Sequence, residues 1–237
     1  MSSMYNRFLK LSIYGESHGD GIGMVLDNLP AGETIDRSEL LKFTARRTAK
    51  PGELHSTART EADLPTFFSG YYRGLTTGTP LAAMIKNTNT QSQDYGDMQF
   101  LARPGHADYT GFVRYHGAND IRGGGHFSGR LTAPLVLAGG ICKQILERRG
   151  IYCASHIYSI KDVKDTPFME TEIPEELIHR LHNSSFPVID QEQEALMKNA
   201  VEQARLNSDS VGGIIECAVT GLPCGIGSPM FDGIENI

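Results

Sequence analysis

Residues 88–130 form a long polar stretch in which apolar positions recur with neither a helical nor a strand period, and in which glycine, aspartate, arginine and histidine are frequent. A structureless segment of this length is uncommon inside a compact domain, and where it occurs it usually serves a binding or catalytic site. Regular elements on either side must therefore support this stretch, and we expect the chemistry of the protein to depend on it.

Regular elements are predicted on both sides of that stretch. Asp36, with Glu39 three residues later, is a typical N-terminal cap for a helix near residues 37–47. Gly150 is the expected stop of an apolar helix, and Asp190 is the expected cap of a later one. The predicted strands are 7–14, 22–29, 81–86, 151–160 and 211–220, and the remaining predicted helices are 133–149, 174–183 and 191–206. This mixed order, with antiparallel neighbours, indicates an α+β fold.

The chain contains neither an internal repeat nor a linker-like tract, so residues 1–237 are interpreted as a single domain with a polar loop at 51–64. The final residues, Ile234 to Ile237, resemble the opening of another helix or strand. We therefore expect a chain that is truncated, or disordered, beyond residue 237.

Composition excludes several classes of protein. No run approaches about 20 apolar residues, which is the length of a membrane span, and residues 1–10 lack the apolar core of a signal peptide. Four cysteines are scattered without zinc or redox spacing, so reduced thiols, a cytoplasmic location and no metal site are expected. A net charge of −6 and the lack of a basic stripe argue against a nucleic-acid partner.

The first segment that carries chemistry is the glycine-rich loop at 15–23, which contains His18. Its later glycines are spaced G-x-G-x-G, and no helix pattern follows, so it does not fit a dinucleotide-binding fold. A histidine between glycines lies where a ligand can approach the backbone, and imidazole suits proton transfer near neutral pH. The alternative is a hydrogen-bonded turn histidine.

The second segment is 103–109, in which a Pro-Gly turn separates Arg103 from His106. Arginine can bind phosphate or carboxylate with two parallel hydrogen bonds, and the neighbouring histidine can donate a proton to a leaving oxyanion. The alternative is a simple turn that an ion pair between Arg103 and Asp108 stabilises.

The third segment is 122–130, in which three glycines precede His126 and Ser128, and Arg122 and Arg130 flank the run. Backbone N–H groups at the start of the following helix attract anions. A flexible glycine hinge is the alternative. Arg46 and Arg47 add two more cations, although arginines at a helix end can simply complement the helix dipole. A small anionic ligand fits this set better than a polyanion does.

Taken together, these segments resemble three motifs of the chorismate synthase family in order and spacing: 15–19, 103–109 and 122–130. Residues 76–80, 87–89 and 92–95 also resemble family segments, so the likeness covers essentially the whole chain. The resemblance implies a β-α-β sandwich of antiparallel sheets and helices, assembled as a homotetramer. It also implies a carbon–oxygen lyase of the shikimate pathway, which serves aromatic amino acid biosynthesis. With reduced FMN, this enzyme removes phosphate from 5-enolpyruvylshikimate 3-phosphate to give chorismate.

The resemblance also implies residue roles. His18 matches a histidine beside the reduced flavin, and His106 matches the histidine that protonates the departing phosphate. Arg46, Arg47, Arg103 and Arg130 match substrate-binding positions, with Arg46 the weakest match. His126, Phe127 and Ser128 occupy the stretch that contacts FMN, and the region of Arg47 is linked to a nicotinamide nucleotide.

Two departures from the family pattern bear on these roles. Many members have Arg-Ser-Ser-Ala-Arg where this chain has residues 126–130, and many have an arginine near 53–56, where this chain has Glu53, Leu54, His55 and Ser56. The second departure argues against NADPH binding and against an NADPH-dependent flavin reductase. The last third of the family's sequence, which supplies further FMN contacts, lies outside this sequence. The alternative hypothesis is therefore that this chain is a catalytically incomplete, ligand-binding fragment of the enzyme.

Overall fold

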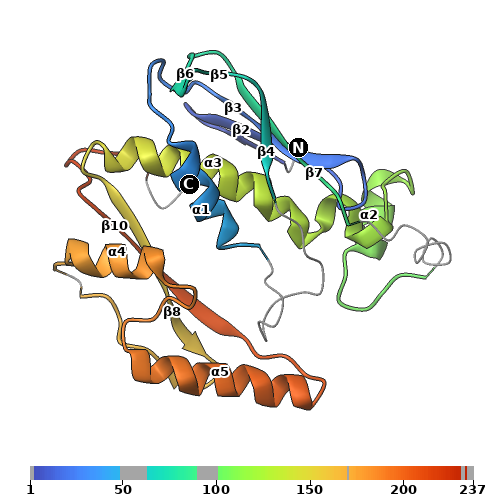
Figure 1. Ribbon diagram of the computed structural model, residues 1–237. Coiled ribbons are helices and arrows are strands. Elements are labelled where there is room, and N and C mark those ends of the chain that lie inside the picture. The colour runs from blue at the N-terminus through green and yellow to red at the C-terminus, as the bar shows by residue number, and fades with distance from the viewer. Residues whose placement is uncertain (1–2, 49–62, 90–100, 170, 231–232, 234–237) are drawn as a thin grey trace. The chain divides into compact units, whose positions relative to one another are not determined.

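The computed structural model describes residues 3–48, 63–89, 101–169, 171–230 and 233 (Figure 1). Within it the chain forms two compact units, residues 1–145 and 146–237. The single-domain interpretation of residues 1–237 stays a prediction. The predicted loop at 51–64 lies outside the described residues except for its last two positions. Glu53, Leu54, His55, Ser56, the segment 92–95 and the final residues 234–237 also lie outside them.

The first unit is built on a five-stranded sheet in the order β1-β2-β3-β7-β4, and each neighbouring pair in it is antiparallel. Its strands are β1 (Met4–Asn6), β2 (Lys10–Gly15), β3 (Gly21–Asp27), β7 (Leu81–Lys86) and β4 (Pro65–Ser69). Ile22, Met24 and Leu26 alternate along β3 and are fully buried. One face of the sheet therefore forms the wall of the core.

Two helices cover that face: α1 (Arg37–Ala45) and α3 (Thr132–Glu147) (Figure 1). Asp36 caps α1 as predicted, since its carboxylate accepts hydrogen bonds from the backbone N–H groups of Ser38 and Glu39. Leu137 and Ile141 of α3 are fully buried in the shared core. Truncating either one to alanine should cost about 2–5 kcal/mol of stability.

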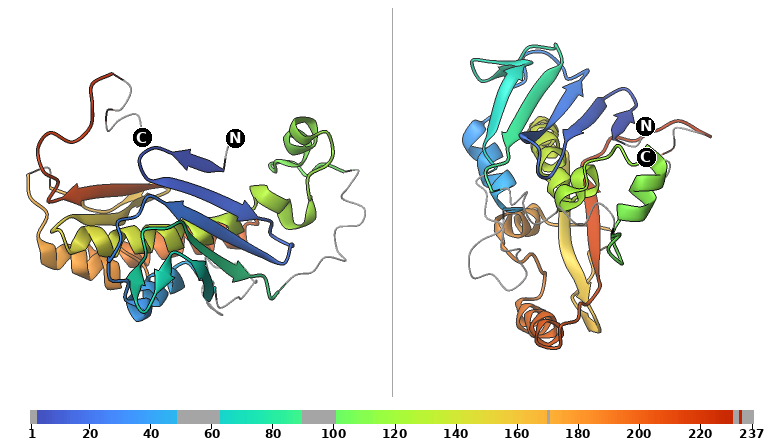
Figure 2. Two further views of the ribbon diagram at one scale, coloured as in Figure 1. Left: turned by 90° about the horizontal axis from the view of Figure 1, so that it is seen from above. Right: turned by 90° about the vertical axis from the view of Figure 1, so that its right-hand side faces the viewer.

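The predicted structureless stretch contains a helix that the sequence pattern did not indicate, α2 (Asp108–Tyr115). Two short 3-10 segments follow it, η3 (Arg122–Phe127) and η4 (Gly129–Leu131), and they lead directly into α3. Gly123, Gly124 and Gly125 interrupt η3 with positive φ angles of 58°, 83° and 53°. Figure 2 shows α2 and these turns beyond the C-terminal end of β2. A small hairpin of β5 (Tyr71–Tyr72) and β6 (Leu75–Thr76) completes the unit.

The second unit contains an antiparallel sheet in the order β10-β8-β9, with two helices packed on it. Its elements are β8 (Tyr152–Ile160), β9 (Val163–Lys164), α4 (Glu175–Asn183), α5 (Gln191–Leu206) and β10 (Gly213–Thr220). The buried His156 of β8 lies between two carboxylates: Nδ1 is 2.9 Å from Oδ2 of Asp165, and Nε2 is 2.7 Å from Oε2 of Glu216. Both units combine helices with antiparallel sheets, so the predicted α+β class is confirmed.

Candidate active site

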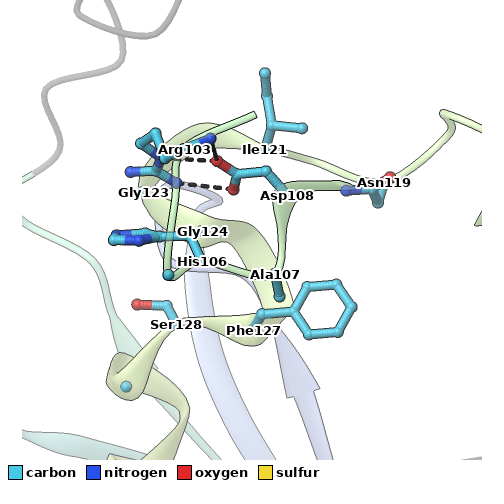
Figure 3. A pocket seen from close by; sticks show the side chains of 12 residues that line it. Arg103, His106, Ala107, Asp108, Asn119, Ile121, Gly123, Gly124, Phe127 and Ser128 are labelled. Atoms are coloured by element: carbon cyan, nitrogen blue, oxygen red, sulfur yellow. Dashed lines mark hydrogen bonds and ion pairs between the residues drawn. The ribbon is translucent and has the colours of Figure 1, made fainter. Parts of the chain in front are cut away.

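A cavity of about 510 Å³ lies in the first unit, between the segment at 103–108 and the segment at 119–129 (Figure 3). The predicted second and third segments thus face a common space. The cavity is lined by Arg103, Gly105, His106, Ala107, Asp108, Asn119, Ile121, Gly123, Gly124, Phe127, Ser128 and Gly129. The cavity offers a cation, an imidazole, a hydroxyl and several exposed backbone segments to a ligand.

Arg103 and Asp108 form the rigid side of this cavity. Nε of Arg103 donates to Oδ2 of Asp108 at 2.8 Å, and Nη2 donates to Oδ1 at 3.0 Å. The backbone N–H of Arg103 also donates to this carboxylate, at 3.0 Å. The hydrogen bonds from Arg103 lower the pKa of Asp108 to about 2. The ion pair that the sequence left as an alternative is therefore present, and it closes the turn that carries His106.

His106 is exposed, and its ring lies between the ion pair and Ser128 in the view of Figure 3. Nδ1 is 3.3 Å from the carbonyl oxygen of Pro104. Because a carbonyl only accepts hydrogen bonds, this contact requires the proton on Nδ1 and leaves Nε2 for a ligand. Gly105 has a φ of 75°, and the backbone turn at this residue leaves the ring of His106 exposed.

His18 does not line the cavity, but it lies directly against Gly123, which does. A Cβ atom at Gly123 would overlap the Cε1 and Nδ1 atoms of the His18 ring. The loop of His18 is also joined to the third segment by the backbone, since the N–H of Ser17 donates to the carbonyl of Gly125 at 3.1 Å. All three predicted segments therefore meet in one region.

The FMN-contact stretch divides between the cavity and the protein interior. Phe127 and Ser128 line the cavity. His126 has protein contacts at both ring nitrogens: Nδ1 is 2.7 Å from the carbonyl oxygen of Gly15, and Nε2 is 2.5 Å from the hydroxyl of Ser3. In this structure His126 joins the third segment to the start of the first, and a flavin contact for it stays a prediction.

The other predicted substrate-binding arginines are not among the residues that line the cavity. Nη1 of Arg47 donates to Oδ2 of Asp63 at 2.7 Å, and Nη1 of Arg130 pairs with Oδ1 of the same carboxylate. Arg130 and Asp63 are buried, and Arg47 also donates to the hydroxyl of Thr132 at 2.9 Å. Arg46 is the exposed C-cap of α1. Substrate binding by these three arginines stays a prediction.

Arg122, the fifth candidate arginine, pairs with Asp120 at 2.7 Å. Hydrogen bonds from Arg122 lower the pKa of Asp120. Burial, followed by the hydrogen bond with Asp120, raises the pKa of the Glu16 carboxyl. The pKa values of these two neighbouring carboxyls are therefore moved in opposite directions.

Sequence reasoning missed two polar residues of the site. Asp63 joins two arginines that lie far apart along the chain, and neither its spacing nor its neighbours signalled this role. Asn119 lines the cavity, and its buried Oδ1 has no hydrogen-bond partner within the described part of the chain. A polar residue beside the glycine run was the only available signal for Asn119. Among the described helices, none has the length and hydropathy to cross a bilayer.

Comparison with known proteins gives a consistent result. A protein-family model described as chorismate synthase matches residues 9–237. A chorismate synthase from Lancefieldella parvula is 40% identical over the whole of this chain, and one from Pyrococcus abyssi is 42% identical over 98% of it. The chain spans 64% and 63% of the length of these two relatives. A solved structure titled "Crystal Structure of Chorismate Synthase" superposes with a TM-score of 0.70 at 25% identity, covering 94% of this chain and 61% of the other.

Proposed function

The chain belongs to the chorismate synthase family, and we propose that it carries the family's reaction, the elimination of phosphate from 5-enolpyruvylshikimate 3-phosphate to give chorismate. The observation that supports this proposal best is the cavity that brings Arg103, His106 and Ser128 together beside four glycines. A substrate with a phosphate and carboxylates needs a guanidinium and fixed hydrogen-bond donors in place of water.

The cavity fits a flat, reduced flavin in two respects. A Cβ atom built at Gly105 or Gly129 would meet nothing within 4 Å, and one at Gly124 would come no closer than 3.8 Å, to Cβ of Ser128. The backbone at these glycines can therefore be approached closely by a ring system. The buried Oδ1 of Asn119 can accept a hydrogen bond from an N–H group of such a ring.

Phe127, Ser128 and Asn119 would hold the cofactor, and reduced FMN would supply an electron-rich ring that assists departure of the phosphate. The protein's own contribution is a proton at a defined atom. With Nδ1 held by the carbonyl of Pro104, a protonated His106 can donate from Nε2 to an oxygen of the leaving phosphate. Arg103, fixed on Asp108, places positive charge on the same side of the cavity.

A second proton-handling group is expected beside the flavin, where it would manage the protonation of the reduced ring. His18, held against Gly123, is the residue we assign to that task. From the family we also expect the enzyme to be cytoplasmic and to form a homotetramer. The proposal does not include NADPH binding, because residues 53–56 depart from the family pattern.

The test is phosphate release from 5-enolpyruvylshikimate 3-phosphate under anaerobic conditions with dithionite-reduced FMN. We expect His106→Asn to lower the rate by about 10²-fold or more, because the general acid is removed. His116→Asn is the matched control: it changes another exposed histidine, at the C-terminal end of α2, and introduces a side chain that tolerates the φ of 55° at that position. A His106→Asn rate within threefold of the wild type would overturn the assignment of His106. The absence of turnover in the wild-type chain would overturn the proposal that this chain carries the reaction.

A further inference from the structure

The loop between β2 and β3 carries His18, and the side-chain amide of Asn87 contacts its backbone at two points. Asn87 directly follows β7, and its Nδ2 donates two hydrogen bonds: to the carbonyl of Glu16 at 2.9 Å and to the carbonyl of Gly19 at 2.8 Å. These carbonyls lie on either side of His18 in the sequence. Both hydrogens of the amide are therefore used to fix the backbone around this histidine.

The orientation of the Asn87 amide follows from its third contact. Nε of Arg130 lies 3.3 Å from Oδ1 of Asn87. Because arginine only donates hydrogen bonds, the oxygen of the amide must face Arg130, and the NH₂ group must face the loop. A flipped amide would place N–H against N–H on one side and oxygen against two carbonyls on the other.

Arg130 is itself held in place. Its guanidinium pairs with Asp63, and the same carboxylate binds Arg47 at 2.7 Å. The side chains of Arg130 and Asp63 are only 6% and 4% exposed. A buried charge with a fixed partner moves little, because losing that partner inside the protein is costly. Asp63, Arg130 and Asn87 thus form a continuous support that ends at the loop of His18.

We propose that Asn87, oriented by Arg130 and Asp63, is the positioning residue that holds His18 beside Gly123 and the cavity. This inference rests on the proposed function for what His18 does, but the placement itself does not depend on turnover. In this proposal Asn87 does not itself contact the ligand; it positions a residue that acts there. Its effect should therefore pass through the position of His18.

The test compares Asn87→Asp with Asn28→Asp in the 237-residue chain. Asn87→Asp keeps the shape and the acceptor for Arg130, but it places a carboxylate oxygen against two carbonyls. Asn28 lies at the other end of β3, and its Nδ2 donates to the carbonyl of Phe8 at 2.7 Å, so its variant loses an amide donor in the same hairpin. Asn87→Ser, which keeps one donor, is the second variant should Asn87→Asp fail to fold.

Two readouts decide the result without turnover. Hydrogen exchange of the amides of Ser17 and Gly19 should rise about tenfold in Asn87→Asp, less in Asn87→Ser, and not at all in Asn28→Asp. The Cε1–H resonance of His18, assigned with His18→Gln, should shift in the Asn87 variants and not in Asn28→Asp. An unchanged His18 resonance with unchanged loop exchange would overturn the inference.

A kinetic readout separates positioning from a general loss of stability. In the phosphate-release assay, Asn87→Asp should lower kcat more than it raises KM, and it should add no further loss to His18→Gln. Additive losses would overturn the claim that Asn87 acts through His18. A chain without turnover would count against the proposed function alone, since the exchange and resonance measurements still decide the placement.

Discussion

The contact between Gly123 and His18 predicts a difference between two neighbouring substitutions, Gly123→Ala and Gly124→Ala. Both glycines line the cavity, and both have positive φ angles, 58° and 83°. Alanine at either position therefore adopts a left-handed conformation, at a cost of about 1–2 kcal/mol. This shared cost makes Gly124→Ala a matched control for backbone strain.

The two substitutions differ in what the new methyl group meets. At Gly124 the nearest atom, Cβ of Ser128, lies 3.8 Å away, which is ordinary van der Waals contact. At Gly123 the methyl group would overlap the imidazole of His18, so the ring or the backbone must move. Overpacking of this kind adds about 1–3 kcal/mol. Gly123→Ala should therefore lose about 2–5 kcal/mol and Gly124→Ala about 1–2 kcal/mol.

Urea unfolding followed by far-UV circular dichroism measures both losses, and the Cε1–H resonance of His18 reports the displacement directly. We expect that resonance to move in Gly123→Ala and to stay within its wild-type line width in Gly124→Ala. Equal destabilisation of the two variants, together with an unmoved His18 resonance in both, would refute the packing of His18 against Gly123.

Three further predictions concern single polar groups. Arg103 lowers the pKa of Asp108 from its ordinary value of 3.8 to about 2, so the ionised carboxylate stabilises the fold above pH 3.8. This contribution should disappear as the pH falls from 3.8 towards 2, and the unfolding free energy of Asp108→Asn should vary less across that range. His156→Leu should cost about 3 kcal/mol in urea unfolding, because the buried Asp165 loses its side-chain hydrogen-bond partner and retains the backbone N–H donors of Ile189 and Asp190; a loss under 1 kcal/mol would contradict this account. Asn119→Leu should leave the melting temperature unchanged or raise it, since an unsatisfied buried acceptor is removed, yet it should weaken FMN binding in a flavin titration; unaltered FMN affinity would remove Asn119 from the site.

Much of the fold could be predicted because local signals and burial agree there. The strand at 81–86 has the predicted bounds, and its alternating Leu81, Ala83 and Ile85 are buried. Gly150 ends the region of α3 as expected: it has a φ of 73°, and its N–H donates to the carbonyl of Glu147. In such elements the period of apolar residues and the capping residues indicate the same structure.

The helix α2 shows where local signals were insufficient. No side chain caps its start at Ala107, and Gly111 lies in its middle, so propensity and capping argue against it. A Cβ atom at Gly111 would come within 2.8 Å of the Phe127 ring, so glycine lets the ring pack closely against this helix. Tertiary packing, which a single sequence does not display, decides the structure of this segment.

The candidate site was partly predictable for a similar reason. Residue types identified the three segments and their imidazoles, since glycine, arginine and histidine have distinctive chemistry at short spacing. The partners of those residues were not predictable, because Asp63 meets Arg130 across 67 residues of sequence and Asn87 meets Glu16 across 71. Long-range pairing of this kind depends on sheet order, here on the placement of β7 beside β3.

The last paired positions of β2 and β3 are Gly15 and Ile22, so only the six residues 16–21 lie between them. Because Ile22, Met24 and Leu26 all point into the core, adding or deleting one residue in that crossing would either turn this apolar row outward or shift the imidazole away from its neighbours. The length of this turn is therefore tied to the hydrophobic interior. An insertion or deletion here should therefore disrupt the site even where every individual side chain is retained.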